Sequence, residues 1–329
     1  MPTGLDNRYP RLLADIGGTN ARFALQTERG LADIRVMACA EHPTFDAAVH
    51  SYLAAVGTPA VRHAAIGIAN PVHGDWVQMT NHDWAFSVEA TRKAMGLSTL
   101  LVMNDFTALA LSLPHLPQKD LVQVGGTESV PNAAIGLLGA GTGLGISGLI
   151  PASGGGVGAL AGEGGHVSFT PFDEREIDLW RFAHARHGHV SAERILSGPG
   201  LQLIHEWLSR RAGVSFQPLP AAEISRRGLE GYDALCRDAI AMFCGALGTV
   251  AGDLALILGA SGGVYVGGGI VPKFGEYFAH SPFRSRFQNK GRFSKYLAAI
   301  PVFVITSAWP SLIGAASALD EHLERAAHA

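Results

Sequence analysis

Four clusters of glycine residues constrain the fold of this chain more than any other feature of its sequence. The 329 residues include 41 glycines, roughly 12%, where about 7% is usual. The clusters lie at 14–25, 137–150, 154–166 and 259–274. Glycine adopts the positive φ angles that tight turns need, so we expect these segments to be turns between packed strands or helices.

The first two clusters share one plan, in which an apolar strand leads into a Gly/Thr turn and a second strand follows. We interpret both as β-hairpins. They begin about 120 residues apart, at Asp15 and Gly139, which suggests a distant internal duplication with one hairpin heading each of two domains. The cluster at 259–274 differs, because "VYV" predicts a strand, "GGG" a turn and "IVPKFGEYF" a helix with Pro272 in its first turn.

Two common phosphate-binding loops are excluded by the sequence. No GxxxxGK[ST] motif occurs, so the chain has no P-loop. The segment 143–148 matches GxGxxG, but "LIPASGGG" after it is not a helix, and the dinucleotide-binding fingerprint requires one. We treat that match as a product of the high glycine content.

Composition indicates a compact protein whose positive and negative charges are nearly balanced. Hydrophobic residues make up 47% and charged residues 16%, and the net charge is −3. No basic field is available for binding nucleic acid or an anionic membrane. The three cysteines, Cys39, Cys236 and Cys244, form no CxxC pair, and no apolar run near the start resembles a signal sequence. We therefore expect a cytoplasmic protein without a membrane or nucleic-acid partner.

The order of predicted elements indicates two α/β domains. A helix is expected at 87–96, with Ser87 as its N-cap, and another in "FTALALSLPHL", ending before Pro114. The polar segment 114–126 is the expected crossing between domains, and the last strand and helix could return to the first domain. We expect a small domain at 1–115 plus about 302–329, and a large domain at 116–301.

Asp15 follows an apolar strand and precedes the first glycine turn. Backbone N–H groups of such a turn can bind phosphate oxygens, but a neighbouring carboxylate repels phosphate unless a divalent cation lies between them. Mg²⁺ is commonly held by carboxylates and waters in that way. Asp15 is therefore either an indirect Mg²⁺ ligand or a residue that stabilises the turn, and the second glycine turn at 139–143 favours the Mg²⁺ role.

Asn104 and Asp105 end the apolar run "LSTLLVM". Asp105 could be the N-cap of the next helix, or a general base at the strand end, where open α/β sheets bind their ligands. Asn104 could bind a sugar or simply end the strand.

Three further polar residues lie at or near glycine-rich turns. Glu163 and His166 in "GEGGH" could bind several hydroxyls of one ligand, although they could also be ordinary polar residues of a turn. A zinc site at His166 is disfavoured, since no suitable partner residues are near in sequence. Glu193 is expected in the first turn of a helix, where it either binds a ligand or interacts with the helix dipole.

Eight motifs in order along the chain resemble the bacterial ATP-dependent glucokinases of the non-ROK type. They are "ADIGGTN", "TNHDWAFS", "NDFTALALSLP", "GAGTGLG", "GEGGHVSF", "GHVSAERILSGPGL", "GGVYVGGGIVPKF" and "KGRFSKYLAAIPVFVI". The resemblance covers almost the whole chain. It implies a two-domain actin-like ATPase fold, related to ribonuclease H, with duplicated mixed sheets flanked by helices and an interdomain cleft. The cysteine motif of the ROK sugar kinases is absent.

The resemblance also implies roles for individual residues. Asp105 would be the catalytic base, and the glucose ligands would be Asn81, Asn104, Asp105, Glu163, His166 and Glu193. The ATP phosphates would be bound by Ala14, Asp15, Ile16, Gly17, Gly18, Thr19, Gly139, Gly141, Thr142 and Gly143. Gly267, Gly268 and Gly269 would approach the adenosine, and Asp15 would hold Mg²⁺ through water.

The expected function is phosphoryl transfer from MgATP to the 6-hydroxyl of glucose, the entry step of glycolysis, by a cytoplasmic homodimer. Two of three alternatives remain open. The chain could phosphorylate mannose, an N-acetylhexosamine or a carboxylate, or it could be a sugar-sensing regulator. The third alternative, an Hsp70-like ATPase, would need a peptide-binding extension that the chain has no room for.

Overall fold

The computed structural model describes residues 9–80, 82–152 and 156–328. The chain forms two compact units: unit 1 is Met1–Leu116 with Ser307–Ala329, and unit 2 is Pro117–Thr306. The return to unit 1 begins later than the expected residue 302. The reason is that strand β13, Val302–Ile305, pairs with two strands of unit 2, so only the final helix belongs with unit 1.

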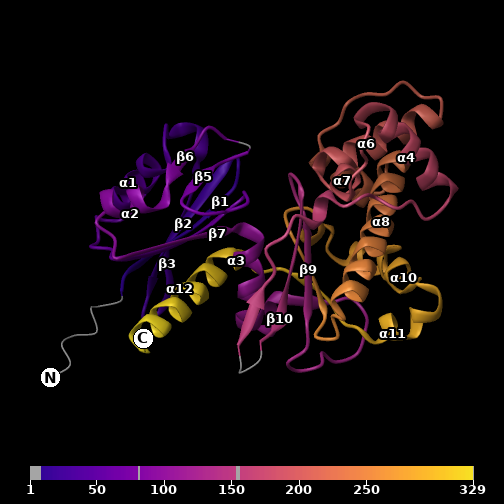
Figure 1. Ribbon diagram of the computed structural model, residues 1–329. Helices are drawn as coiled ribbons and strands as arrows, with labels where there is room; N and C mark the ends of the chain where they lie inside the picture. The colour runs from indigo at the N-terminus through magenta and orange to yellow at the C-terminus, as the bar shows by residue number, and fades with distance from the viewer. Residues whose placement is uncertain (1–8, 81, 153–155, 329) are drawn as a thin grey trace. The chain divides into compact units, whose positions relative to one another are not determined.

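Unit 1 is built on a five-stranded mixed sheet in the order β3-β2-β1-β4-β7 (Figure 1). The first three strands are antiparallel, whereas β1, β4 and β7 are parallel. The strands are β1 Arg11–Ile16, β2 Asn20–Thr27, β3 Gly30–Ala38, β4 His63–Ile68 and β7 Thr99–Asn104. A small hairpin of β5 Trp76–Gln78 and β6 Ala85–Ser87 lies outside this sheet. The helical elements are η1 Cys39–Glu41, α1 Phe45–Ala55, α2 Val88–Ala94, α3 Asp105–Ser112, η2 Leu113–His115 and α12 Pro310–His328.

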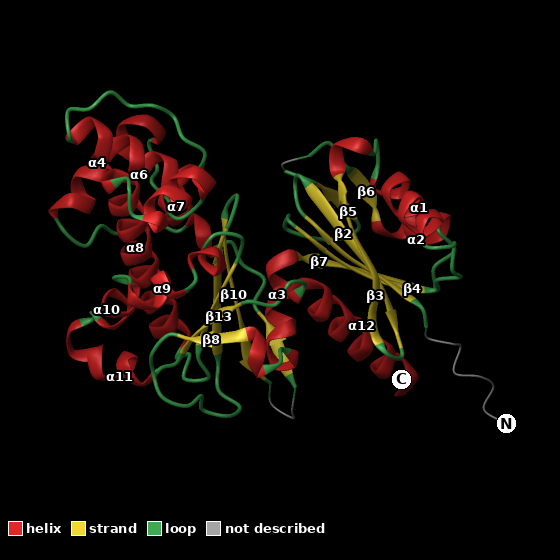
Figure 2. Cartoon of the chain, turned by 180° about the vertical axis from the view of Figure 1, so that it is seen from behind, coloured by secondary structure: helices red, strands yellow, loops and turns green. Residues whose placement is uncertain are grey.

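Both faces of the unit 1 sheet are covered by helices (Figure 2). Leu12 belongs to the same buried cluster as Phe45 and Tyr52 of α1. Its neighbour Leu13 belongs instead to the cluster formed with Leu312 and other residues of α12. Successive side chains of a strand point to opposite faces, so the apolar run of β1 supplies two cores at once.

Two glycines allow helix α3 to pack closely against its neighbours. A Cβ atom on Gly314 of α12 would lie 1.7 Å from the carbonyl oxygen of Ala108, and one on Gly67 of β4 would lie 3.1 Å from the Ala108 Cβ. A larger residue at Gly314 would overlap the backbone of α3. The close packing therefore fixes the position of α3, whose first residue is Asp105.

Unit 2 repeats the strand plan of unit 1. Its sheet order is β11-β10-β9-β12-β13-β8, with β11, β10 and β9 antiparallel and β9, β12 and β13 parallel. This corresponds strand for strand to β3-β2-β1-β4-β7, with β8 added at the edge. The strands are β8 Leu121–Gln123, β9 Ile135–Ala140, β10 Leu144–Pro151, β11 Val157–Ala159, β12 Val264–Gly267 and β13. Both predicted hairpins are confirmed, and the matching sheet orders agree with the suggested duplication.

The helices of unit 2 include the long helix α8 and several that pack against it (Figure 1). They are α4 Glu174–His187, α5 Ala192–Ile195, α6 Gly198–Arg211, α7 Ala221–Glu230, α8 Ala234–Leu258, α9 Glu276–His280, α10 Phe283–Gln288 and α11 Ser294–Ala299. Four short 3₁₀ segments are η3 Gln118–Asp120, η4 Gly164–His166, η5 Val271–Phe274 and η6 Gly291–Phe293. The predicted helix after the "GGG" turn is broken into η5 and α9, because Gly275 between them has φ of 54°.

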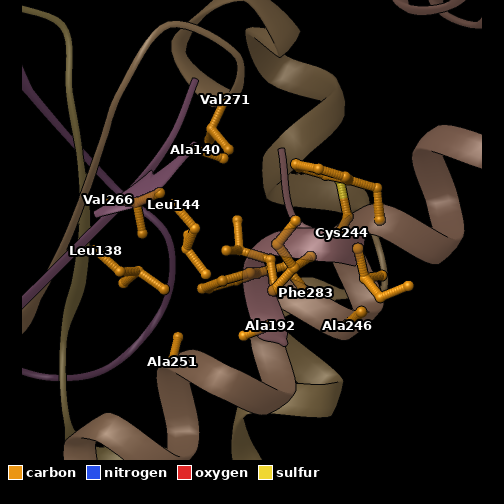
Figure 3. Packing of buried hydrophobic residues seen from close by; sticks show 14 of the residues in the cluster. Leu138, Ala140, Leu144, Ala192, Cys244, Ala246, Ala251, Val266, Val271 and Phe283 are labelled. Carbon is orange, nitrogen blue, oxygen red and sulfur yellow. The ribbon is translucent and has the colours of Figure 1, made fainter. Parts of the chain in front are cut away.

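The core of unit 2 joins strand β9 and the start of β10 to α8. Leu138, Leu144 and Cys244 belong to one buried cluster, and Figure 3 shows side chains of that cluster at close range. Helix α8 is long and apolar enough to cross a membrane by composition alone, but 67% of its most apolar window is buried inside the protein. We therefore interpret α8 as the core helix of unit 2. All three cysteines of the chain are buried and free of disulfides.

Candidate functional site

The strand register of unit 1 brings Asp15 and Asp105 to the same edge of its sheet. Asp15 pairs with Gly67 of β4, and Gly67 pairs with Met103 of β7. Because these strands are parallel and adjacent strands lie about 4.8 Å apart, Asp15 and the end of β7 are separated by two strands, or roughly 10 Å. The carboxyl ends of parallel strands are where open α/β sheets bind ligands.

Asp15 lies directly before a tight turn and is paired with Arg22. Its Oδ2 atom lies 3.0 Å from the Arg22 Nη1 atom, and the turn is closed by a 3.0 Å hydrogen bond from the Gly17 N–H to the Asn20 carbonyl. Burial raises the pKa of the Asp15 carboxyl, and the charge and hydrogen bond of Arg22 offset part of that shift. Asp15 is therefore a mostly buried carboxylate, with a side chain 17% exposed, directly before the turn.

Cys39 of η1 donates two hydrogen bonds to the same turn. Its backbone N–H donates to the Thr19 carbonyl at 2.9 Å, and its Sγ donates to the Gly17 carbonyl at 3.4 Å. Two carbonyls of the turn therefore accept hydrogen bonds from one residue of η1.

Asn104, rather than Asp105, is the N-cap of helix α3. The Asn104 side-chain oxygen accepts from the N–H groups of Phe106 at 2.9 Å and Thr107 at 3.2 Å. Asp105 is the first helical residue, and its Oδ1 accepts from the Phe106 N–H at 2.9 Å. The N-cap interpretation of Asp105 was therefore wrong by one residue, because Asn104 has the extended conformation that the cap position requires.

The Asn104 amide also links two segments of unit 1. Its Nδ2 lies 3.4 Å from the Asn70 carbonyl, and the Asn70 side chain accepts hydrogen bonds from the backbone N–H and the hydroxyl of Thr80. Asn81, a predicted glucose ligand, lies outside the described residues. Asn70 therefore connects the end of β7 with the segment that leads to residue 80.

Three backbone segments of unit 2 meet at the second glycine turn. The turn is closed by a 2.8 Å bond from the Gly141 N–H to the Gly143 carbonyl, and the Gly198 N–H, at the start of α6, donates to the Gly141 carbonyl at 2.8 Å. Gly268 follows β12 with φ of 84°, and a Cβ there would lie 2.4 Å from the Ala140 carbonyl oxygen. Only glycine permits this approach, so the turns at 139–143 and 267–269 lie side by side.

A cavity of about 640 Å³ opens where these three segments meet. Ligand pockets of small molecules typically measure about 300–1,000 Å³, so a nucleotide could fit. Its walls are mostly small or apolar residues with several polar groups among them. The lining residues are Gly141, Thr142, Gly198, Pro199, Gln202, Ala221, Ala222, Ser225, Arg226, Leu229, Gly269, Ile270 and Lys273.

The two cations of this cavity differ in their partners. Arg226 binds Glu223 and Glu230 and donates to the Tyr232 hydroxyl. Exposed Lys273 has no ion pair with any of the residues that the structure describes. Lys273 is therefore the cation available to an anionic ligand.

The predicted sugar ligands of unit 2 lie on two adjoining segments. Glu163 precedes η4 and His166 ends it, and their side chains are 55% and 60% exposed. Glu193, on α5, is half-buried, and its Oε2 accepts the Leu144 N–H at 2.9 Å. Glu163 and His166 are thus open to a ligand, whereas Glu193 is already bound to the end of the glycine turn.

Several residues at these positions were not identified from the sequence. The pairing of Asp15 with Arg22 could have been, since a turn centred on Gly18 and Thr19 places them opposite each other. The start of α6 and Lys273 had no such local signal. No cluster of three or more potential metal-ligating side chains occurs within 9–80, 82–152 and 156–328. A cation held mainly by one carboxylate and by phosphate oxygens is compatible with that result.

Comparison with known proteins identifies clear relatives of this chain. The family model described as Glucokinase matches residues 12–322. The glucokinase of Chromobacterium violaceum is 58% identical over 324 residues, covering 98% of this chain and 93% of that protein.

Solved structures show the same fold. The crystal structure of a glucokinase from an Antarctic psychrotroph has a TM-score of 0.85 and 34% identity, covering 95% of this chain and 99% of that one. A ROK-family glucokinase from Streptomyces griseus, solved in complex with glucose and AMPPNP, has a TM-score of 0.66 at 22% identity, covering 95% and 99%. The expected actin-like ATPase fold with mixed sheets flanked by helices is therefore confirmed.

Proposed function

The chain belongs to the glucokinase family and is a glucose kinase, and on that premise we propose a role for each residue of the site. ATP donates the phosphoryl group to the 6-hydroxyl of glucose. The glycine turns hold the nucleotide, Asp105 acts as the base, and Glu163, His166, Glu193, Asn104 and Asn81 bind the sugar. The observation that supports this most is the convergence of three backbone segments on the 640 Å³ cavity of unit 2.

The nucleotide would occupy that cavity with its phosphates toward Gly141 and Thr142. Its apolar walls suit a base and ribose, while the turn offers backbone N–H groups to the phosphates. The start of the 14-residue helix α6 lies at the same place, and the helix dipole favours anions there. Lys273 would add the cation that the glycine turns lack. The AMPPNP in the Streptomyces griseus structure supports ATP as the donor.

Asp15 and its turn suit a Mg²⁺ ion that is bound mainly by phosphate and water. When bound, the ion would neutralise charge on the transferring phosphoryl group. Asp15 would hold the ion through water, and Arg22 would keep the carboxylate oriented. The turn would place the N–H groups of Gly18 and Thr19 toward the phosphates, since the Gly17 N–H closes the turn.

Asp105 would orient the sugar hydroxyl and accept its proton. It is partly exposed at the start of α3, whose position is fixed by Gly314 and Gly67. Phosphoryl transfer requires alignment and charge stabilisation more than covalent help from the protein. A base held on a closely packed helix meets that requirement.

Sugar selectivity would come from fixed polar partners. Glu163, His166 and Glu193 would each bond to a sugar hydroxyl. An analogue that lacks one of these hydroxyls leaves the protein group that bound it unpaired. The Balamuthia mandrillaris glucokinase, solved with glucose, shares the fold. Mannose points its 2-hydroxyl in another direction and an N-acetylhexosamine replaces it with an acetamido group, so both would be used less well than glucose.

A coupled assay with MgATP tests the proposal directly. Glucose should be phosphorylated, with mannose and N-acetylglucosamine much poorer substrates, and activity should disappear when Mg²⁺ is chelated. Equal rates on all three sugars would contradict the assigned sugar ligands, and full activity in chelator would contradict the role of Asp15.

We also infer that the chain acts at the entry of glycolysis as a cytoplasmic homodimer. Similarity to glucokinases of bacteria supports this inference. Sedimentation analysis at micromolar protein should give twice the 34.6 kDa chain mass, and a monomer under those conditions would reject the dimer.

A further inference from the structure

Glu193 makes a contact that a sugar ligand would not need. Its Oε2 accepts the backbone N–H of Leu144 at 2.9 Å, where the glycine turn ends and β10 begins. A Cβ atom on Gly143 would lie 2.3 Å from the same oxygen. The Glu193 carboxylate can therefore reach the turn only because residue 143 is a glycine. The charged carboxylate then fixes the backbone at Leu144.

Helix α5, which carries Glu193, is bonded to the other predicted sugar-binding segment, which contains Glu163 and His166. The Ala192 N–H donates to the Val167 carbonyl at 2.8 Å, which attaches α5 to the segment after His166. A Cβ on Gly165 would lie 1.9 Å from the Leu144 carbonyl oxygen. Leu144 therefore contacts Glu193 through its N–H and η4 through its carbonyl.

We propose that Glu193 is a positioning residue for the phosphate-binding turn as well as a sugar ligand, and that it couples glucose binding to nucleotide binding. This inference rests on the proposed function of the two segments. Oε2 holds the turn at Leu144, and a sugar hydroxyl binds the other carboxylate oxygen. One side chain then serves both substrates.

The coupling follows from the rigidity of the shared carboxylate. Without sugar, Glu193 is held at Oε2 by one backbone N–H. A sugar hydroxyl bound to Oε1 restricts the side chain further and so stabilises the turn geometry that binds phosphate. Binding linkage is reciprocal, so nucleotide must tighten glucose binding by the same factor.

Calorimetric titration of MgADP in the absence of sugar separates the two roles of Glu193. Glu193→Ala removes the acceptor of the Leu144 N–H, and we expect the MgADP Kd to rise by about tenfold, the effect of losing one charge-assisted hydrogen bond. Glu193→Gln keeps an oxygen acceptor, and its Kd should stay within about threefold of wild type. Glu174→Ala is the matched control, because Glu174 is an exposed glutamate of α4 in the same unit, and its sugar-free Kd should not change.

Repeating the titration with saturating glucose measures the coupling. The wild type should bind MgADP more tightly with glucose than without it, and Glu193→Ala should lose this difference even when enough glucose is present to saturate the variant. An unchanged sugar-free Kd in Glu193→Ala, or an equal glucose effect in wild type and Glu193→Ala, would overturn the proposal.

Two controls separate loss of coupling from loss of the fold. Thermal unfolding of each variant shows whether the fold is retained, and Glu193→Gln tests the idea if Glu193→Ala does not fold, since its glucose-dependent gain in MgADP affinity should be smaller than in wild type. If the wild type itself bound no MgADP, the proposed nucleotide site would fail, which is a different outcome from the loss of coupling.

Discussion

The carboxylate of Asp15 lies 3.0 Å from the guanidinium of Arg22, its partner across the turn between β1 and β2. Burial raises the pKa of Asp15, and the charge and hydrogen bond of Arg22 offset part of that rise. A carboxyl with a raised pKa loses its charge at a higher pH than usual as the solution is acidified. The proposed Mg²⁺ role needs the charged form, so Arg22 widens the pH range in which Asp15 can serve.

Replacing Arg22 should therefore move the acid limb of activity. In Arg22→Gln the attraction that favours ionised Asp15 is lost, so the pKa of Asp15 rises further, and the fall in kcat/KM at low pH should begin at a higher pH than in wild type. Profiles of kcat/KM against pH measure this. Arg29→Gln, which changes an exposed arginine in the turn between β2 and β3, is the control. An acid limb at the same pH in wild type and Arg22→Gln would contradict the role of the Arg22–Asp15 pair.

Asp105→Asn should abolish most turnover while keeping the fold. The amide cannot accept the proton of the sugar hydroxyl, so kcat should fall by about two or more orders of magnitude. Glucose binding should persist, since an amide still accepts and donates hydrogen bonds. Steady-state kinetics and glucose titration measure the two effects; turnover close to wild type would rule out Asp105 as the base.

Asn104→Ala should lower stability more than Asp105→Ala does. Asn104 caps two N–H groups of α3, and loss of an N-cap typically costs about 1 kcal/mol. Asn104→Asp restores a good capping oxygen and should recover most of that loss. Urea unfolding of the three variants compares them, and a larger loss in Asp105→Ala would place the cap at residue 105 after all.

Lys273→Ala should weaken ATP binding and leave the sugar unaffected. Lys273 lines the 640 Å³ cavity, and removing a cation that contacts phosphate should raise KM for ATP by about tenfold with little change in KM for glucose. Lys295→Ala, an exposed lysine of α11 in the same unit, is the matched control. An unchanged KM for ATP in Lys273→Ala would show that the nucleotide does not use that side chain.

Much of the fold could be predicted because it depends on near neighbours in the sequence. Glycines at 17, 18, 141 and 143 specify tight turns, and apolar runs specify the strands β1 and β9 that lead into them. The N-cap at 104 was missed by one residue, because Asn and Asp both cap well and only the backbone conformation decides between them. The strand at 302 was assigned to the wrong unit, since an apolar strand can pair in either sheet.

The sequence by itself determined the two glycine hairpins, the strand that ends at Asn104 and Asp105, and through its motifs the glucokinase family. Only the tertiary structure decided that Gly141, Gly198 and Gly269 line one cavity, that Lys273 is the cation beside it, and that Glu193 reaches the Leu144 N–H. The physical reason is range. Turns and apolar strands are set by residues a few positions apart, whereas the walls of a site are joined by backbone contacts between segments that are distant along the chain.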